Sequence, residues 1–403
     1  MANSIAITTG YILRESLVVL ENNLVAGSWV NKQYSKEFAV EGGKKGDVIN
    51  VRVPPRYIVN EGAAYIPQNS TEDRVPVKLD FQAQIGLPFT NRDLTLSVDD
   101  FTKRFIGPAV SALANDIDRR VLSTARTFNN AVGTPGTVPA SLAIYADAGV
   151  AMSDSAVPLD RRGIFLSSRM EATLVTALQG LFHQSAAIAA QYLNGQMGRA
   201  GGFLFHMDQN VMTHTVGPLG GAPRVNGVPA SGATALITDG WTSAAANRLL
   251  YGDRYTIADV NSVNPHSRES TGQLCMFVVE ADADSDGSGN LTVTSYPPMI
   301  ASGQFQTIDA MPANNAVITV VGAANKQTKV GLALYPDAIT LATADLFVPN
   351  GADMAGRLAD DQLGISIRLW RDGDIKTDSL DTRLDILGGV KVIRREMGVA
   401  IYS

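Results

Sequence analysis

The sequence predicts an α+β fold, in which one long helix and many strands share the chain. A continuous apolar stripe with three- and four-residue steps runs through residues 98–128, which is typical of an amphipathic helix. Apolar and polar residues alternate with a period of two at residues 48–53 and 77–81, which indicates half-exposed strands. Residues 217–321 are rich in Gly, Pro, Ser and Thr, carry short strand-like runs and lack helical periodicity, so we expect an all-β module there.

Charge and composition exclude some classes of function. The chain has 403 residues and a formal net charge of −6, so it lacks the overall basic charge with which nucleic-acid readers bind phosphates. A protein that encloses nucleic acid without adhering to it remains compatible with this charge. Only 18% of the residues are charged, against about 25% in typical soluble proteins. This low value suggests that partners cover part of the surface.

Cysteine usage and the N-terminus bear on the compartment. The single cysteine, Cys275, permits no intrachain disulfide, and its apolar surroundings in the sequence predict a small buried side chain. The first residues lack the basic stretch and apolar run of a signal peptide. No segment has the roughly 18 consecutive apolar residues of a transmembrane helix. We therefore expect a soluble protein that is made inside the cell.

The N-terminal region is expected to form an arm with one short helix, followed by a protruding β-ribbon. Apolar residues in the first part follow helical spacing at Ile12, Leu13, Leu17, Val18, Leu20 and Leu24. The strands predicted at residues 48–53 and 77–81 enclose proline-containing turns and polar residues. They should pair antiparallel. Because the ribbon has little apolar mass of its own, it should rest on a neighbouring subunit.

The long helix is expected to begin at Ser97. The Ser97 side chain can cap the helix N-terminus, and Asp99 and Asp100 complement the positive end of the helix dipole. Gly107 and Pro108 should kink or divide the helix.

Short helices and strands make up the rest of the chain. We expect a buried strand at residues 163–166 and a helix at residues 170–191 that is broken near Gly180. The strand-like runs of the all-β module are residues 255–257, 275–279, 291–294 and 317–321. Residues 331–346 return to a mixed α/β pattern, and closing strands are expected at residues 364–370, 384–387 and 390–393.

Three aspartates, Asp282, Asp284 and Asp286, are spaced two residues apart, as at the start of an EF-hand calcium loop. The loop position that needs a bidentate Glu is occupied by Val293, which cannot bind a metal. Both flanks favour strands, and Asp, Ser, Gly and Asn tolerate a positive φ. We therefore interpret the segment as a β-hairpin turn, whose three carboxylates crowd one exposed tip. That tip is either solvated or in contact with a basic patch on a neighbouring subunit.

The sequence contains no convincing catalytic constellation. No pair has zinc-hydrolase spacing among the four histidines, His183, His206, His214 and His266. One glycine-rich segment resembles a phosphate-binding loop only loosely, with Gly195, Gly198, Gly201 and Gly202. It follows a predicted helix instead of a strand and lacks the final Lys-Ser/Thr of such loops. There is no Gly-x-Ser-x-Gly nucleophile elbow. We expect no enzyme activity, no cofactor and no metal.

Several longer segments resemble the major capsid proteins of tailed bacteriophages, in particular the podoviral coat-protein family that carries an insertion domain. The most extensive of them is GISIRLWRDGDIKTDSLDTRLDILGGVKVIRREMGVAI near the C-terminus. The resemblance continues in KKGDVINVRVPPRYIVNEG, LTLSVDDFTKRFIGPAVSALANDIDRRVLSTA, LYGDRYTIADVNSVNP and YPDAITLATADLFVPNG. Their order and spacing, from about residue 44 to the end, give the resemblance its specificity.

The resemblance implies the Hong Kong phage type of capsid fold. The implied parts are an N-terminal arm at residues 1–38, an extended β-loop at 39–92, a spine helix with peripheral domain at 93–135, an axial domain at 136–216 that returns at 322–360, an inserted β-domain at 217–321, and peripheral C-terminal strands at 361–403. Such proteins form hexamers and pentamers of an icosahedral shell around double-stranded DNA, first as a procapsid and then in expanded form. The implied partners are further copies of the chain, a scaffolding protein, a portal protein and decoration proteins, with assembly in the host cytoplasm and no membrane.

Candidate functional residues follow from these expectations. Contacts between subunits are expected at Lys44, Lys45, Arg52, Arg56, Glu61, Glu72, Asp73, Arg74, Asp282, Asp284 and Asp286. The resemblance places a turn formed by Trp370, Arg371 and Asp372 beside the spine helix, with the Trp370 ring buried and the charges paired locally. The alternative for these three residues is core packing with a solvated loop. Two other functions stay open, a calcium-dependent β-rich adhesin and an α/β hydrolase.

The calcium hypothesis leads to a direct test. Titration calorimetry of the purified protein should show no calcium binding tighter than millimolar, because the loop lacks the bidentate carboxylate that organises such a site. A micromolar site that disappears when Asp282, Asp284 and Asp286 are replaced with Asn would contradict the hairpin interpretation.

Overall fold

The computed structural model describes residues 9–33, 48–59, 62–63, 65–70, 72–90, 105–177, 199–360, 364–374 and 379–403. The chain divides into two compact units. Unit 1 comprises Met1–Val51, Arg74–Val121 and Ile339–Ile393, and unit 2 comprises Arg52–Asp73, Leu122–Ala338 and Arg394–Ser403. Helices and strands occur in both, which confirms the predicted α+β class. No described helix is long and apolar enough to cross a membrane.

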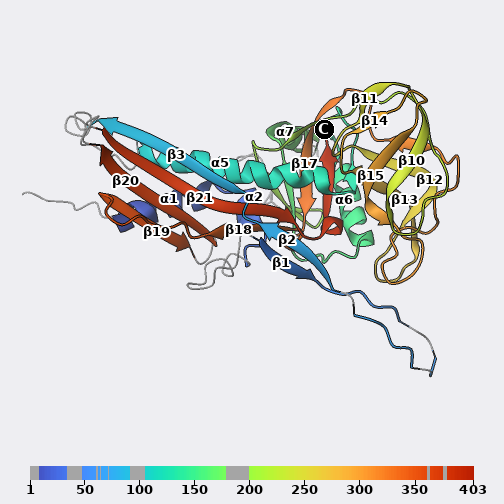
Figure 1. The fold of residues 1–403 in the computed structure, drawn as a ribbon, viewed down its shortest axis with the longest axis horizontal. Coiled ribbons are helices and arrows are strands. Elements are labelled where there is room, and N and C mark those ends of the chain that lie inside the picture. Colours follow the sequence, from blue (N-terminus) through green and yellow to red (C-terminus); the bar gives the residue numbers. More distant parts are fainter. Residues whose placement is uncertain are drawn as a thin grey trace, which may run out of the picture. The chain divides into compact units, whose positions relative to one another are not determined.

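Unit 1 is built on an antiparallel sheet around one long central strand (Figure 1). That strand, β21 (Ser379–Val392), pairs with β3 (Phe81–Thr90) on one side. On its other side it pairs with β20 (Ile365–Asp374) and then with β18 (Ile339–Ala344). The edge strand β19 (Met354–Asp360) pairs with β20.

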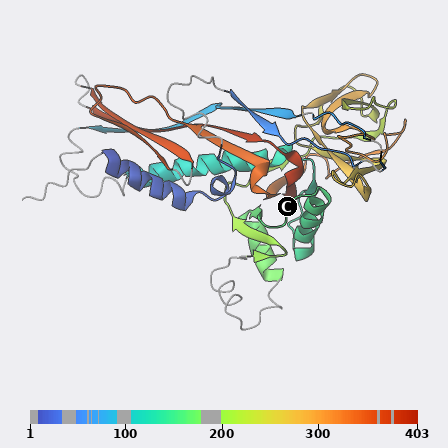
Figure 2. The ribbon, with the colours of Figure 1, turned by 90° about the horizontal axis from the view of Figure 1, so that it is seen from below.

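Two helices, α1 (Thr9–Asn23) and α5 (Gly107–Ser123), lie beside each other along the sheet of unit 1 (Figure 2). The Ser111 hydroxyl of α5 donates a hydrogen bond to Asn23 at the end of α1. Both helices bury most of the apolar stripes predicted from the sequence, including Ile12, Leu13, Leu17 and Leu20 in α1 and Val110, Leu113, Ile117 and Val121 in α5. Val18, which was also predicted for the stripe of α1, is 52% exposed, so its inclusion is wrong. For the other residues, helical periodicity identified the buried face correctly.

The predicted boundaries of the long helix need correction. The α-helix ends at Ser123, and Thr124–Thr127 form a 3₁₀ turn, η2, instead of a further α-helical turn. At its start, α5 begins at Gly107 after a π-helical turn at residues 105–106, and Pro108 lies in the first turn, where a missing N–H is tolerated. The predicted cap residues Ser97, Asp99 and Asp100 lie outside the described residues.

Strand boundaries in unit 1 also differ from the prediction in two places. Residues 384–387 and 390–393 were predicted as two strands, but β21 is one strand through Gly388 and Gly389. These glycines permit close packing, because a Cβ on Gly389 would lie 1.8 Å from the Lys78 carbonyl oxygen. Residues 77–81 were predicted as one strand, but they span the end of β2 (Asp73–Lys78) and the start of β3.

Trp370 lies within β20, so the predicted turn at Trp370, Arg371 and Asp372 is wrong. Each of the three residues continues the ladder with β21. The Trp370 ring is half-buried beneath the Arg368 guanidinium, whose central carbon lies 5.5 Å from the ring centroid. Arg371 forms an ion pair of 2.8 Å with Asp353, and the exposed Asp372 accepts a hydrogen bond from the Gly373 N–H.

Unit 2 contains a mixed sheet of seven strands. Its path runs β4 (Ala131–Val132), β22 (Gly398–Tyr402), β17 (Gln327–Leu334), β5 (Arg162–Leu166), β7 (Phe203–Met207) and β6 (Arg199–Ala200), and β8 (Thr213–Thr215) pairs with β17. The predicted strand at residues 163–166 is confirmed as β5, whereas β22 was not predicted. Helices α6 (Leu142–Asp154) and α7 (Ser168–Ala177) accompany this sheet.

A second sheet of unit 2 has the strand order β16-β12-β13-β15-β10-β9. Its strands are β9 (Gly221–Val225), β10 (Ala233–Trp241), β12 (Arg254–Val263), β13 (Ser270–Val279), β15 (Leu291–Met299) and β16 (Ile318–Val320). Two short strands, β11 (Ala245–Leu249) and β14 (Ala283–Ser285), pair beside it. All lie within residues 217–321, and the four runs predicted there are confirmed as strands. Their assignment to an inserted domain remains a prediction.

Asp118 provides a test of how unit 1 is held together. Its buried carboxylate accepts hydrogen bonds from the backbone N–H groups of Val25, at 2.9 Å, and Gly27, at 2.6 Å, which fixes α2 (Ala26–Trp29) against α5. Replacing Asp118 with Ala should lower the free energy of unfolding by about 3 kcal/mol, since both donors lose a charged acceptor. Denaturant unfolding measures this loss. Asp116→Ala is the control, because Asp116 forms only partly exposed pairs with Arg119 and Arg120, and a loss of similar size there would contradict the assignment.

Candidate functional site

The segment between β1 (Val48–Val53) and β2 is an extended arm, defined here as residues 54–70 (Figure 1). Its described residues form no regular strand, and Pro54, Pro55 and Pro67 cannot donate backbone hydrogen bonds. The two branches are joined through side chains. The Gln68 amide accepts a hydrogen bond from the Ile58 N–H at 2.8 Å and donates one to the Ile58 carbonyl. The Tyr57 and Ser70 hydroxyls lie 2.7 Å apart.

Large apolar side chains of the arm face solvent. Val59 and Tyr65 are each 90% exposed, and Ile66 is 55% exposed. A set of neighbouring apolar side chains left uncovered is typical of a surface that binds another protein.

The charged candidates of the arm have different surroundings. Arg52 and Glu72 form an exposed ion pair of 3.5 Å between the two branches. Arg56 pairs with Glu396 at 3.2 Å, close to the C-terminus. Asp73 and Arg74 are exposed residues of β2. Lys44, Lys45 and Glu61 lie outside the described residues.

The base of the arm is attached to the second sheet of unit 2. The Arg268 guanidinium, from the turn between β12 and β13, donates to the Tyr57 carbonyl at 2.8 Å. The Gln304 side chain donates to the Arg56 carbonyl. These bonds restrain the start of the arm, while its apolar side chains stay uncovered.

The predicted hairpin around the three aspartates is confirmed, because β13 and β15 pair antiparallel. The prediction of one crowded, exposed tip is wrong. Ala283–Ser285 form β14, which pairs with β11, so the aspartates are held apart along a strand. The Asp282 carboxylate accepts the N–H of Tyr251 at 2.7 Å, and the Asp284 carboxylate accepts the N–H of Asn247 at 2.6 Å.

Asp286 organises the tight turn itself. Its carboxylate accepts the backbone N–H groups of Ser288 and Asn290, both at 2.8 Å, and the Asn290 amide at 3.0 Å. The hydrogen bonds from Asn290 are the largest cause of a lowered pKa for this carboxyl group. Within the described ranges, no three His, Cys, Asp or Glu side chains are grouped as a metal ion would require.

The histidines and glycines considered from the sequence occupy separate places. His206 stacks on Phe165, with ring centroids 5.1 Å apart, and burial lowers its pKa. His266 lies in the turn after β12, and His183 lies outside the described residues. Gly201 and Gly202 form the turn between β6 and β7 with positive φ angles of 56° and 85°. Gly195 and Gly198 also lie outside the described residues.

A buried arginine, which the sequence analysis missed, joins three segments of unit 2. Arg254, at the start of β12, donates to the carbonyls of Ala125 and Phe128, both at 2.7 Å, where η2 ends. It also donates to the Tyr402 hydroxyl of β22 at 2.5 Å. Arg254 is 1% exposed, and no described carboxylate forms an ion pair with it. The partial negative charge of carbonyls at a helix end compensates part of its charge.

The preceding residue, Asp253, fixes the chain that enters the second sheet. Its carboxylate contacts His214 at 2.9 Å and accepts the N–H groups of Gly217, at 3.1 Å, and Leu250, at 2.8 Å. His214 and Asp253 are both buried. The only signal in the sequence for the contacts of Asp253 and Arg254 was their position between Gly252 and a strand-like run. Such a local pattern does not reveal partners that are distant in sequence.

Comparison with known proteins identifies one family. The family model described as P22 coat protein, gene protein 5, matches residues 67–402. No curated protein matches the sequence. Similar solved structures include Mycobacterium phage Che8, with 13% identity over 94% of this chain and 90% of that chain and a TM-score of 0.49. The capsid of cyanophage P-SCSP1u has 10% identity over 89% and 84% of the chains and a TM-score of 0.46. The mature capsid of bacteriophage PhiM1 has 9% identity over 94% and 86% and a TM-score of 0.45.

Replacing Arg254 with Met should lower the free energy of unfolding by about 3 kcal/mol or more. The buried carbonyls of Ala125 and Phe128 would lose their donor, and Met cannot replace it. Thermal or denaturant unfolding of the purified subunit measures the loss. Arg224→Met is the matched control, because Arg224 is exposed on β9 and makes one long bond, of 3.3 Å, to the Asn315 carbonyl. Equal stability of the two variants would show that Arg254 does not join the segments.

Proposed function

Because this chain belongs to the P22 coat protein family and is a major capsid protein that builds the shell of a tailed phage, we propose that its arm is a contact between neighbouring subunits. The observation that carries the proposal is the 90% exposure of Val59 and Tyr65 on a segment with little core of its own. Covering such side chains contributes free energy to assembly that the isolated subunit cannot gain.

The attachment of the arm base supports this role. Arg268 and Gln304 hold the backbone of Tyr57 and Arg56, so the arm is partly oriented before it meets a partner. A partly ordered arm loses less conformational entropy on docking than a free chain does. We assign the apolar residues beyond Tyr57 to the contact and Arg52 and Glu72 to its rim, where charges adjust specificity.

The remaining contact candidates are carried forward as proposals. Asp73 and Arg74 flank the arm on β2. Lys44, Lys45 and Glu61 belong to this proposal from the sequence alone. Asp282, Asp284 and Asp286 already accept backbone hydrogen bonds, so their contribution to a neighbouring subunit would be electrostatic and would weaken with salt.

The wider assembly role follows from the family. The chain has a structural role in the virion capsid and assembles with further copies of itself. We propose that these copies form hexamers and pentamers around a scaffolding protein, with a portal protein and decoration proteins as further partners, in the host cytoplasm. The domain boundaries given from the sequence, including the inserted β-domain, belong to the same proposal. The net charge of −6 supports the enclosure of DNA without tight binding.

Removal of the apolar arm surface tests the proposal. The triple variant Val59→Ser, Tyr65→Ser and Ile66→Ser should lower the yield of closed shells at least about tenfold, since burial of each side chain contributes about 1.5 kcal/mol or more. The unfolding midpoint should stay unchanged, because these side chains are exposed in the subunit. Negative-stain microscopy and size-exclusion chromatography measure assembly.

The control carries Val228→Ser and Ile237→Ser, which are 63% and 55% exposed on another part of unit 2. Normal shell yield from the arm variant, or an equal loss in the control, would remove the arm from the assembly contact.

A further inference from the structure

The strand β3 forms one edge of the sheet of unit 1 (Figure 1). One side of β3 pairs with β21 over its full length, and no described strand pairs with the other side. It is the longest described strand that is paired on one side only. Such an edge presents unpaired N–H and C=O groups, onto which another strand can add.

Pro88 determines which backbone groups of β3 face outward. In an antiparallel pair, residues that exchange hydrogen bonds with the partner strand alternate with residues whose N–H and C=O groups point away from it. Pro88 has no N–H group, so its position opposite Asp381 is of the second kind. The register with β21 has no shift, so Gln82, Gln84 and Gly86 occupy the same kind of position. These three residues are exposed, and their N–H groups are available to a partner strand.

The side chains of β3 give this edge no protection against pairing. Natural proteins usually block open edges with charged residues, especially Lys. The 10 residues of β3, FQAQIGLPFT, include no charged side chain, although 18% of the whole chain is charged. The edge strand on the other side of the same sheet, β19, carries Arg357 and Asp360. The uncharged edge of β3 is therefore suited to a contact with a partner strand.

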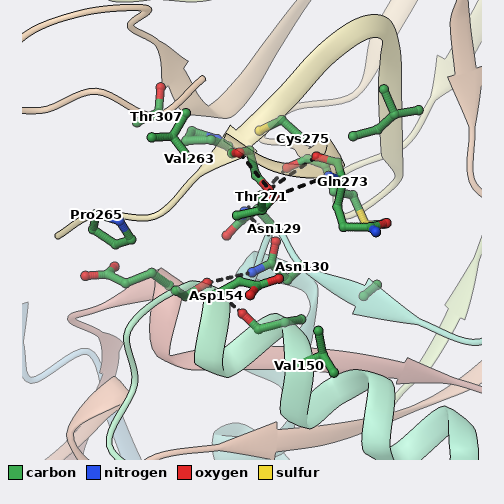
Figure 3. Close-up of a pocket in the computed structure, with 18 of the residues that line it drawn as sticks. Asn129, Asn130, Val150, Asp154, Val263, Pro265, Thr271, Gln273, Cys275 and Thr307 are labelled. Atoms are coloured by element: carbon green, nitrogen blue, oxygen red, sulfur yellow. Dashed lines mark hydrogen bonds between the residues drawn. The ribbon is translucent and has the colours of Figure 1, made fainter. Parts of the chain in front are cut away.

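The strands β12 and β13 of unit 2 use their backbone groups differently. β12 pairs with β13 and β16, and β13 also pairs with β15, so both are paired on two sides. The ladder between them is irregular beside the pocket in Figure 3. There the Thr271 hydroxyl accepts the Gln273 N–H at 3.3 Å and donates to the Ser262 carbonyl at 3.1 Å. In the described part of the chain, no such hydrogen bond reaches the outward N–H groups of β3.

We propose that this edge pairs with the same edge of a second copy of the chain, antiparallel about a twofold axis at Gln84. The outward donors are symmetric about this residue, so Gln84 lies opposite Gln84 of the second copy, and Gln82 lies opposite Gly86. Each such pair exchanges two N–H···O bonds. The ladder ends at Pro88, which has no donor to offer. Because the facing residues are uncharged, no like charges oppose each other across the axis.

A second copy is the partner because the spacing is self-complementary and copies of the chain meet in the shell. A coat protein assembles with further copies of itself, and a twofold contact needs one surface that pairs with itself. The spacing about Gln84 gives no advantage to an unrelated strand. The contact lies in unit 1 and uses none of the arm residues, so it does not rest on the proposed role of the arm.

Cysteine substitution at the axis tests this register. Opposite residues of a hydrogen-bonded antiparallel pair have Cα atoms about 5.5 Å apart, which is a separation that a disulfide spans. Assembled shells of Gln84→Cys should therefore give disulfide-linked dimers after mild oxidation, measured on a non-reducing denaturing gel. The native Cys275 is buried, so the unsubstituted chain should give none. Oxidised shells of Gln84→Cys without dimers would overturn the proposal.

Gly86→Cys is the matched control on the same edge. A Cβ at Gly86 has open space, with only the end of the Gln84 side chain 4.0 Å away. In the proposed register the two copies of residue 86 are more than about 13 Å apart, since four residues at about 3.3 Å each separate them. Gly86→Cys alone should give no dimer, whereas shells that mix Gly86→Cys with Gln82→Cys should give one. Equal cross-linking of Gly86→Cys and Gln84→Cys, each alone, would indicate random collision and overturn the register.

Charge variants at the axis give a second measurement. Gln84→Lys and Gln84→Glu each place like charges opposite each other, so each should lower the yield of shells about fivefold. Their unfolding midpoints should stay unchanged, because Gln84 is exposed. An equal mixture of the two variants should restore the yield, since opposite charges then meet across the axis. Thr292→Lys is the control, because Thr292 is exposed on β15, which pairs with β10 and β13. A mixture that assembles no better than either variant alone, or an equal loss in the control, would overturn the twofold contact.

Discussion

Unit 2 depends on a buried positive charge that is neutralised by carbonyl groups instead of a carboxylate. Arg254 brings together the end of η2, the strand β12 of the second sheet and the last strand of the chain, β22. An isolated charge removed from water is costly, and the cost is met here by several well-placed acceptors. Because the partners include the backbone carbonyls of Ala125 and Phe128, Arg254 can bind them only when η2 ends at this point of the chain. The conformations of η2, β12 and β22 around Arg254 therefore depend on one another.

Aspartate carboxylates stabilise other segments by accepting hydrogen bonds from backbone N–H groups. Asp118 in unit 1 and Asp253 in unit 2 are buried, and each receives two backbone N–H groups. Asp282 and Asp284 do the same for one N–H group each at the surface. In a chain with only 18% charged residues, these carboxylates are used to fix loops and strand ends. The spacing of Asp282 and Asp284 has the same origin, because alternate residues along β14 and its flank face the segment that contains β11. Asp286 instead accepts N–H groups of its own turn.

Local patterns in the sequence predicted the elements whose buried face has a simple period. The apolar stripes of α1 and α5 and the strands β1 and β5 are examples. Errors arose where tertiary contacts decide the local structure. Gly388 and Gly389 suggested a break, but close approach of Lys78 keeps β21 continuous. The partners of Arg254 are more than a hundred residues away in sequence, so no local pattern could reveal them. The exposure of the side chains of the arm likewise could not be predicted from the sequence, because the sequence alone does not distinguish a buried Tyr from an exposed one.

The prolines of the arm have a consequence for the behaviour of the subunit at high concentration. Extended segments with exposed apolar side chains are prone to stack on one another through backbone ladders, which leads to fibrous aggregates. Pro54, Pro55 and Pro67 remove donors from both branches, and Gln68 occupies the N–H and carbonyl of Ile58. Two arms therefore lack the free backbone groups for a continuous hydrogen-bonded ladder along their edges, although their side chains remain available for contact with a partner. A partner of the arm would therefore have to recognise the shape of its side chains, because little backbone is left to pair with.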